Sequence, residues 1–194
     1  MTHTNAKIID ITPKIREKLQ EYQDRPDALA YVQELCTFAA RTDTAVKASV
    51  YHRDILPRLV ARVCEVVYLL VCACSVIDCR NPEQRVFHSN YMKNVGEELT
   101  RVLKEVESFI LTLNGTTTRM IRYNLYGQYD RATIQTYMAS VYQALSPFNP
   151  PAESEITNSV QKLIVGPGTG DSSAQSTSLQ LDIVQYLGRI LGMW

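Results

Sequence analysis

The chain has 194 residues, of which 45 % are hydrophobic, and its 20 Lys and Arg residues balance 20 Asp and Glu residues. This hydrophobic content is ample for a core, so the composition excludes a globally disordered protein. The zero formal net charge gives no overall attraction to nucleic acid or to an anionic membrane surface. The length predicts one domain with a tail.

The N-terminal part of the chain predicts two helices. Thr12-Pro13 is a favourable helix start, and a narrow apolar stripe follows it at Ile15, Leu19 and Tyr22. Residues 1–25 are therefore expected to form a short N-terminal helix that ends before Pro26. A second helix is expected over residues 26–50, with one apolar face made of Leu29, Val32, Cys36 and Ala39.

The most apolar segment is residues 59–77, where Arg62 and Glu65 are the only charges. Its uncharged part, residues 66–77, is shorter than the ~20 apolar residues that a bilayer-spanning helix needs. A helix that is apolar nearly all round must be covered by other helices. The segment therefore predicts the buried central helix of a soluble bundle, with Pro57 near its start.

The next long helix has a regular apolar pattern and ends at Asn114-Gly115, since glycine is favoured just past a helix. The opposite face is charged, and we expect Arg101 to pair with Glu97 and Glu105, one turn away on either side. The apolar stripe consists of Val95, Leu99, Val102, Leu103, Val106, Ile110 and Leu113.

The following segment predicts a short crossing helix over residues 119–126 and then a last long helix with Asp130 as its N-cap. Ser146-Pro147 ends that helix. Its expected apolar stripe consists of Ile134, Tyr137, Met138, Val141, Tyr142 and Leu145.

Residues 149–178 are rich in Pro, Ser, Thr and Gly, which predicts a flexible linker, interrupted by the apolar hexad 160–165. Residues 179–194 predict an amphipathic C-terminal helix. It is expected to dock on the bundle or on a partner as a helix in a groove. Its apolar face consists of Ile183, Leu187, Ile190, Leu191 and Trp194.

Together these elements predict an all-α fold. Residues 26–148 are expected to form an antiparallel four-helix bundle, with the short crossing helix between its third and fourth long helices. The N-terminal helix, the linker and the amphipathic C-terminal helix flank this bundle. The N-terminus lacks the apolar segment of a signal peptide, which predicts a cytoplasmic protein with reduced thiols.

The resemblance to a known bundle family rests on residues 94–110, on the segment 119–126 with its Arg and Tyr residues, and on residues 134–148. The third helix is rich in glutamate and ends in a V-E-x-F segment, and the fourth ends in L-x-x-F at Leu145 to Phe148. This pattern is similar to the N-terminal four-helix domain of mixed-lineage kinase domain-like pseudokinases and their fungal counterparts, within the superfamily of HeLo-type cell-death domains and the Cbl adaptor bundle. The resemblance implies a non-enzymatic, oligomerising adaptor or, when released, a membrane-perturbing effector.

Two motifs resemble catalytic or nucleotide-binding loops and fail on their spacing. His52-Arg53-Asp54 resembles the kinase catalytic loop, but Leu59 stands where that loop needs Asn. In the segment 163–172, Val165 and Asp171 replace the first Gly and the Lys of a P-loop. A helix-capping turn and a linker are the favoured interpretations, and an enzyme or nucleotide-binding protein is the minor alternative.

The five cysteines, Cys36, Cys64, Cys72, Cys74 and Cys79, invite a metal-site interpretation. Cys72 and Cys74 point to different sides of a helix, because two residues correspond to about 200° of helical turn. Cys64 and Cys72 lie two turns apart. Buried thiols that act as small hydrophobic groups are therefore the expectation, with no metal and no cofactor.

A basic-aromatic cluster is the candidate contact site for lipid headgroups or a partner: Arg119, Arg122, Tyr123, Tyr126 and Arg131, with Tyr129 beside them. The favoured alternative is that its tyrosines cap one end of the bundle core.

The sequence thus predicts a signalling adaptor that binds protein partners or itself, with no nucleic acid and no small-molecule substrate. A membrane-permeabilising effector, recruited to the membrane when activated, is the principal alternative.

Overall fold

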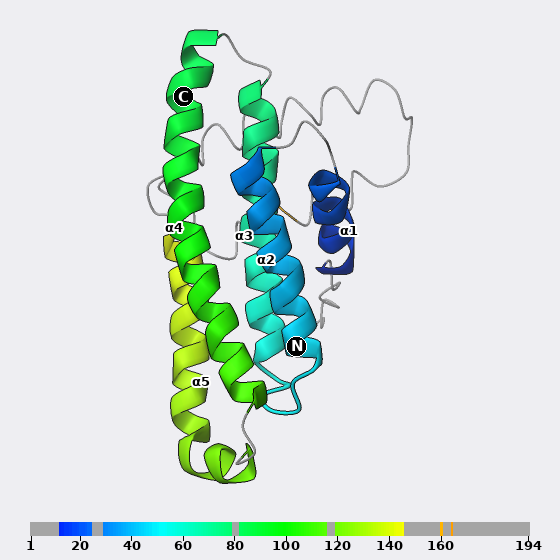
Figure 1. The fold of residues 1–194 in the computed structure, drawn as a ribbon, viewed down its shortest axis with the longest axis vertical. Coiled ribbons are helices and arrows are strands. Elements are labelled where there is room, and N and C mark those ends of the chain that lie inside the picture. The colour runs from blue at the N-terminus through cyan, green and yellow to red at the C-terminus, as the bar shows by residue number, and fades with distance from the viewer. Residues whose placement is uncertain are drawn as a thin grey trace, which may run out of the picture.

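The computed structural model describes residues 12–24, 29–78, 82–115, 119–145, 160 and 164, and it describes no side chains at positions 75–91 and 119–125. This part of the chain is all-helical, with no strand. Figure 1 shows its five helices: α1 (Thr12–Gln23), α2 (Ala30–Lys47), α3 (Leu56–Asp78), α4 (Pro82–Gly115) and α5 (Arg119–Gln143).

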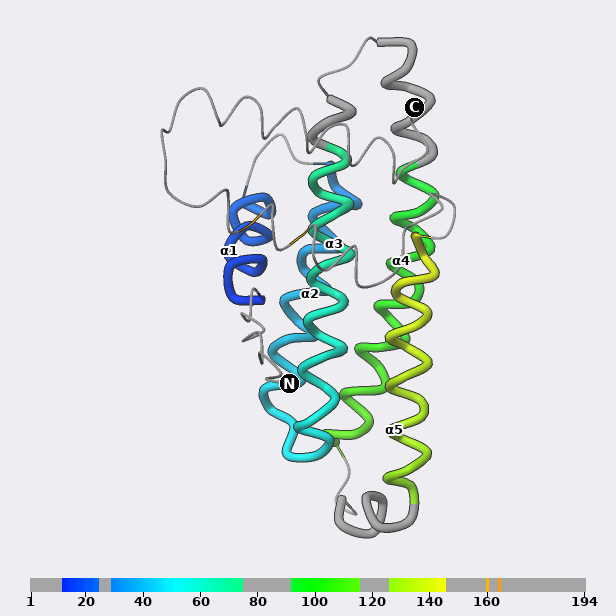
Figure 2. Tube along the Cα trace, turned by 180° about the vertical axis from the view of Figure 1, so that it is seen from behind, coloured from blue at the N-terminus to red at the C-terminus, as the bar shows by residue number. Residues whose placement is uncertain are grey.

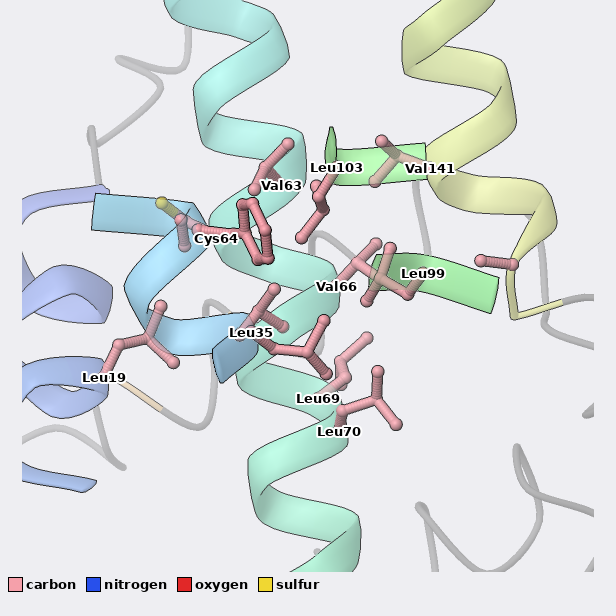
Figure 3. Packing of buried hydrophobic residues seen from close by; sticks show 14 of the residues in the cluster. Leu19, Leu35, Val63, Cys64, Val66, Leu69, Leu70, Leu99, Leu103 and Val141 are labelled. Atoms are coloured by element: carbon pink, nitrogen blue, oxygen red, sulfur yellow. The ribbon is translucent and has the colours of Figure 1, made fainter. Parts of the chain in front are cut away.

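Helix α3 is the centre of the fold, because it packs against each of the other four helices. Side chains on several sides of it are buried, among them Val63, Val66 and Leu70 (Figure 3). The expectation that the apolar run forms a buried central helix is confirmed. Over the described residues, no helix combines the length and the apolar character needed to cross a membrane.

Helix α2 packs more extensively against α4 than against α3, its neighbour in the chain. The ring of Tyr31 lies against Gly96, Arg41 pairs with Glu107 at 2.7 Å, and Asn114 donates a hydrogen bond to the carbonyl of Ala45 at 2.7 Å. These contacts advance in the same order along both helices, so α2 and α4 point in the same direction.

Helix α5 packs against α3 and α4, and both views of the molecule show it running alongside them (Figure 2). The helix is continuous from Arg119, so the segment expected to be a separate helix before Asp130 is the beginning of α5, and Figure 1 shows these first turns bent across the end of the molecule. No proline interrupts residues 119–143, and a single glycine inside a helix costs only about 1 kcal/mol. Asp130 is therefore not an N-cap but a buried residue inside the helix.

Helix α1 lies on α2 and α3 (Figure 2) and buries Ile15, Leu19 and Tyr22, as its stripe predicts. Polar contacts at both ends of α1 tie it to α2. Arg16 pairs with Asp43 at 2.6 Å, and Gln23 donates a hydrogen bond to the Thr37 hydroxyl at 2.9 Å.

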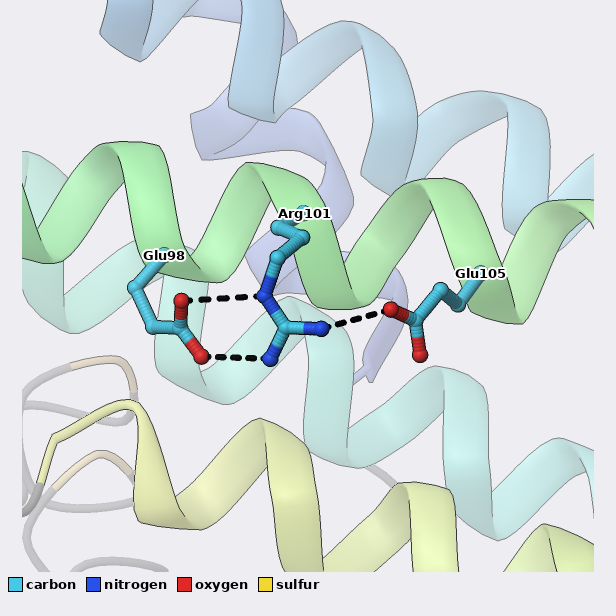
Figure 4. Close-up of polar contacts among 3 residues, drawn as sticks. All are labelled: Glu98, Arg101 and Glu105. Carbon is cyan, nitrogen blue, oxygen red and sulfur yellow. Dashed lines mark hydrogen bonds and ion pairs between the residues drawn. The ribbon is translucent and has the colours of Figure 1, made fainter.

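The expected apolar stripe of α4 is confirmed, since all seven of its residues are buried. The expected ion pair between Arg101 and Glu97 is wrong. Arg101 instead donates two hydrogen bonds to Glu98, at 3.0 and 2.6 Å, and one to Glu105 at 2.6 Å (Figure 4). The planar guanidinium favours a two-bonded carboxylate, which Glu98 provides three residues away, while Glu97 lies 3.9 Å from Lys93.

Two residues of the segment expected to be a linker belong to the core. Val160 has no exposed surface, and Ile164 is partly buried against the same apolar cluster. At these two positions the chain is packed against the core, unlike a linker exposed to solvent. The rest of residues 149–178, and the expected C-terminal helix with Ile183, Leu187, Ile190, Leu191 and Trp194, lie outside the described residues.

Candidate functional site

One end of the molecule brings together the end of α2, the turn into α3, the end of α4 and the first half of α5 (Figure 1). The Asn114–Ala45 hydrogen bond joins the C-terminal ends of α4 and α2, and Arg131 of α5 bonds to Asp54 of the turn. This end contains the part of the basic-aromatic cluster that the structure describes.

The turn between α2 and α3 is built around His52, which is buried and has a positive φ of 53°. Its carbonyl accepts hydrogen bonds from the backbone N–H groups of Ile55 and Leu56, at 3.0 and 2.9 Å, at the start of α3. A left-handed backbone in a residue other than glycine is uncommon and needs local support. The sequence 52–54 is therefore a helix-initiating turn, as expected.

Two polar contacts fasten this turn to α5. The His52 Nε2 atom lies 3.9 Å from a carboxylate oxygen of Asp130, and both side chains are buried. On the surface above them, Arg131 donates a hydrogen bond to the carboxylate of Asp54. This bond holds the pKa of Asp54 below its ordinary value.

Four large apolar or aromatic side chains are exposed at this same end, and we call them the end surface. Tyr126 and Tyr129 are 55 % and 69 % exposed and lie three residues apart on α5. Val50 of the α2–α3 turn is 51 % exposed, and Leu111, one turn before Asn114 on α4, is 55 % exposed. Among the side chains that the structure describes, these are the large hydrophobic groups that remain in water.

The structure thus places two residues of the predicted contact cluster, Tyr126 and Arg131, at this end. The expectation that its tyrosines cap the core is wrong for Tyr126 and Tyr129, which point into solvent. The side chains of Arg119, Arg122 and Tyr123 lie outside the described part.

Sequence reasoning missed Val50 and Leu111. Leu111 follows Ile110, which belongs to the buried stripe of α4. Because successive residues of a helix are about 100° apart, Leu111 lies off that stripe, and this could have identified it as a solvent-facing residue.

A cleft of about 330 Å³ lies beside α1. Arg16, Gln20 and Gln23 of α1 line it together with Cys36 of α2 and Cys64 of α3. Burial raises the pKa of both thiols to about 12. Thiols of this kind are inert at neutral pH, because only the thiolate is a nucleophile or metal ligand.

The described cysteines are Cys36, Cys64, Cys72 and Cys74, and none of these four forms a disulfide. Within the described ranges, no group of three or more His, Cys, Asp or Glu side chains is placed to hold a metal ion. Cys79 lies outside these ranges.

Comparison of the chain with known protein families, with curated proteins and with solved structures finds no match in any of the three. The site is therefore interpreted from its own geometry.

Proposed function

We propose that this protein is a protein–protein interaction module that self-associates through the end surface. The observation that carries the proposal is that the large hydrophobic side chains exposed among the described residues, Val50, Leu111, Tyr126 and Tyr129, come from elements that meet at one end of the helices. Tyrosine is among the residue types enriched at protein interfaces, and Tyr126 and Tyr129, three residues apart, lie on the same side of α5.

The proposed scaffold is a four-helix bundle built from two antiparallel hairpins, α2–α3 and α4–α5. The packing of α2 on α4 and of α3 on α5 supports this arrangement, with α1 as an additional helix on the α2–α3 side. Successive helices of the proposed bundle alternate in direction, and the like-directed α2 and α4 are packed against each other rather than lying on opposite sides of the bundle. Its rigid ends would hold the end surface in one shape.

The occupant of the end surface in this proposal is a second copy of the chain. The formal net charge is zero, so two copies have no overall repulsion to overcome. The resemblance to pseudokinase and cell-death bundles points the same way, because oligomerising adaptors are typical of that group. The role as a cytoplasmic signalling adaptor rests on that resemblance.

The test is the molar mass of the full chain, measured by light scattering after size-exclusion chromatography. The double variant Tyr126→Ser/Tyr129→Ser should lower the mass of the associated species to that of a monomer. A matched control is Gln135→Ser/Gln143→Ser, which changes two exposed residues of the same helix away from the end surface. Equal masses for wild type and the tyrosine variant would refute the role of the end surface.

A membrane-active effector is the second candidate function, and the exposure of Tyr126 and Tyr129 favours it. Tyrosine is enriched at membrane interfaces, and the sequence places Arg119 and Arg122 just before these residues. Under this alternative, anionic vesicles would release dye on addition of the protein. Replacing Arg119 and Arg122 with Gln would abolish the leakage, whereas the self-association described above would persist without lipid.

A further inference from the structure

We propose that the groove on α2 and α3 that holds α1 is also the binding site for residues 183–194 of the same chain. In this proposal α1 and the C-terminal segment compete for one groove, and binding of the segment releases α1. The proposal goes beyond self-association and does not depend on the end surface.

The groove accepts apolar side chains from α1 at a defined spacing. Ile15, Leu19 and Tyr22 enter it and are buried against α2 and α3. Figure 3 shows Leu19 of α1 on the α2 side of α3, where Cys64 also lies. The floor of the groove is small and apolar, with Cys36, Ala39 and Cys64.

Helix α1 fills this groove incompletely. The cleft of about 330 Å³ remains alongside it, and the polar side chains of Gln20 and Gln23 line the α1 side of that cleft. The cleft is open to water, and Cys36, Ala39 and Cys64 form its apolar part. A helix with an apolar side chain in place of Gln23 would cover more of that apolar surface, and removing apolar surface from water is favourable.

The C-terminal segment carries the same spacing as α1 with a larger apolar face. Ile15, Leu19 and Tyr22 correspond to Ile183, Leu187 and Ile190, at i, i+4 and i+7 in both cases. These intervals place side chains on one face of a helix. The C-terminal stripe continues with Leu191 and Trp194, which supply the additional volume that the cleft can accept.

The chain between the core and this segment is long enough to reach the groove. Val160 is buried and Ile164 packs against the core, so the segment is tethered to the core at Ile164. The 19 residue steps from Ile164 to Ile183 span at most roughly 65 Å when extended. Helix α4, with 34 residues, is only about 51 Å long.

Polar contacts explain why α1 is the occupant seen here. Arg16 of α1 pairs with Asp43 at 2.6 Å, whereas the C-terminal segment has Val184 in the corresponding position. Asp43 also pairs with Lys47 at 2.8 Å, so it keeps a partner when α1 leaves. Loss of the Arg16 ion pair should therefore favour the C-terminal segment.

The chain contains a single tryptophan, Trp194, which lies in the proposed ligand segment. Its emission maximum and its quenching by acrylamide report directly whether the segment is buried. Arg16→Ala and Leu19→Asp in the full chain should shift the emission to shorter wavelength and reduce the quenching. Lys14→Ala is the matched control, because it removes an exposed cation of the same helix, and it should behave as wild type.

Adding Leu187→Asp to Arg16→Ala should restore the wild-type emission and quenching. If circular dichroism shows that Leu19→Asp unfolds the protein, the test rests on Arg16→Ala. The Arg16 side chain is one-third exposed, so its removal should not unfold the protein. Unchanged Trp194 emission in Arg16→Ala, or a shift that Leu187→Asp does not reverse, would overturn the proposal. The same result is expected in the Tyr126→Ser/Tyr129→Ser background, which separates this exchange from self-association.

Discussion

The ring of Tyr31 on α2 occupies the space that a side chain at Gly96 on α4 would need. A Cβ atom at position 96 would lie 2.7 Å from Cδ2 and 3.0 Å from Cε2 of that ring. The Tyr31 hydroxyl and the Cys74 Sγ atom are 3.3 Å apart and share a hydrogen bond. Tyr31 therefore covers α4 with its ring and contacts α3 with its hydroxyl, and Gly96 permits this close approach.

Gly96→Ala should therefore destabilise the protein, although alanine is the better helix former by about 1 kcal/mol. Overpacking of this kind costs about 1–3 kcal/mol. We expect this steric cost against the Tyr31 ring to exceed the stability gained from the higher helix propensity of alanine. Urea unfolding followed by circular dichroism measures the difference. Gly115→Ala is the control, because nothing lies within 4 Å of a Cβ at that position. A Gly96→Ala variant more stable than wild type would contradict the packing described.

Two leucines of α4 provide a matched test of the buried face. Leu103 has no exposed surface, whereas Leu111 is 55 % exposed. Leu103→Ala should lower the free energy of unfolding by about 2–5 kcal/mol, and Leu111→Ala should change it by less than about 0.5 kcal/mol at concentrations where the chain is monomeric. Similar losses in the two variants would show that the face of α4 has been assigned incorrectly.

The buried thiols should be protected from modification in the folded protein. Burial raises the pKa of Cys36 and Cys64 to about 12, and that of Cys72, which is partly buried, to about 11, so thiolate is scarce at neutral pH. Labelling with iodoacetamide at pH 7.5, located by peptide mass spectrometry, should be slow at these three residues and fast in denaturant. Rapid labelling of native Cys64 would mean that α1 does not cover it.

The ion pair between Arg131 and Asp54 should make a small, pH-dependent contribution to stability. Because the pKa of Asp54 is lowered in the folded state, this contribution is present at neutral pH. It is lost as the pH falls below the ordinary aspartate pKa of about 3.9. Arg131→Ala should raise the pKa of Asp54, as measured by NMR titration. Arg53→Ala, which removes an exposed cation in the same turn, should leave that pKa in place.

The positions and buried faces of the helices could largely be predicted from the sequence. The stripe from Val95 to Leu113 and the apolar run of α3 predict which residues are buried. Apolar residues that recur with the period of a helix lie on one face of it, and that face packs into the core. Gly115 and Thr12 likewise mark a helix end and a helix start as expected.

The partners of those faces could not be predicted, since an apolar stripe does not identify the helix that will cover it. The same-direction packing of α2 on α4 depends on the close contact between Tyr31 and Gly96, which are 65 positions apart. The buried Asp130 lies 3.9 Å from His52, a residue 78 positions earlier in the chain, and Tyr126 and Tyr129 of the same helix are exposed. Each is set by tertiary structure rather than by local spacing.

If the end surface joins two copies of the chain, sedimentation equilibrium over a range of concentrations should detect the dimer. The wild-type mass should rise with concentration from that of the 22.0 kDa chain toward twice that value. The Tyr126→Ser/Tyr129→Ser variant should remain monomeric under the same conditions. A wild-type chain that stays at the monomer mass at every concentration would contradict the claim.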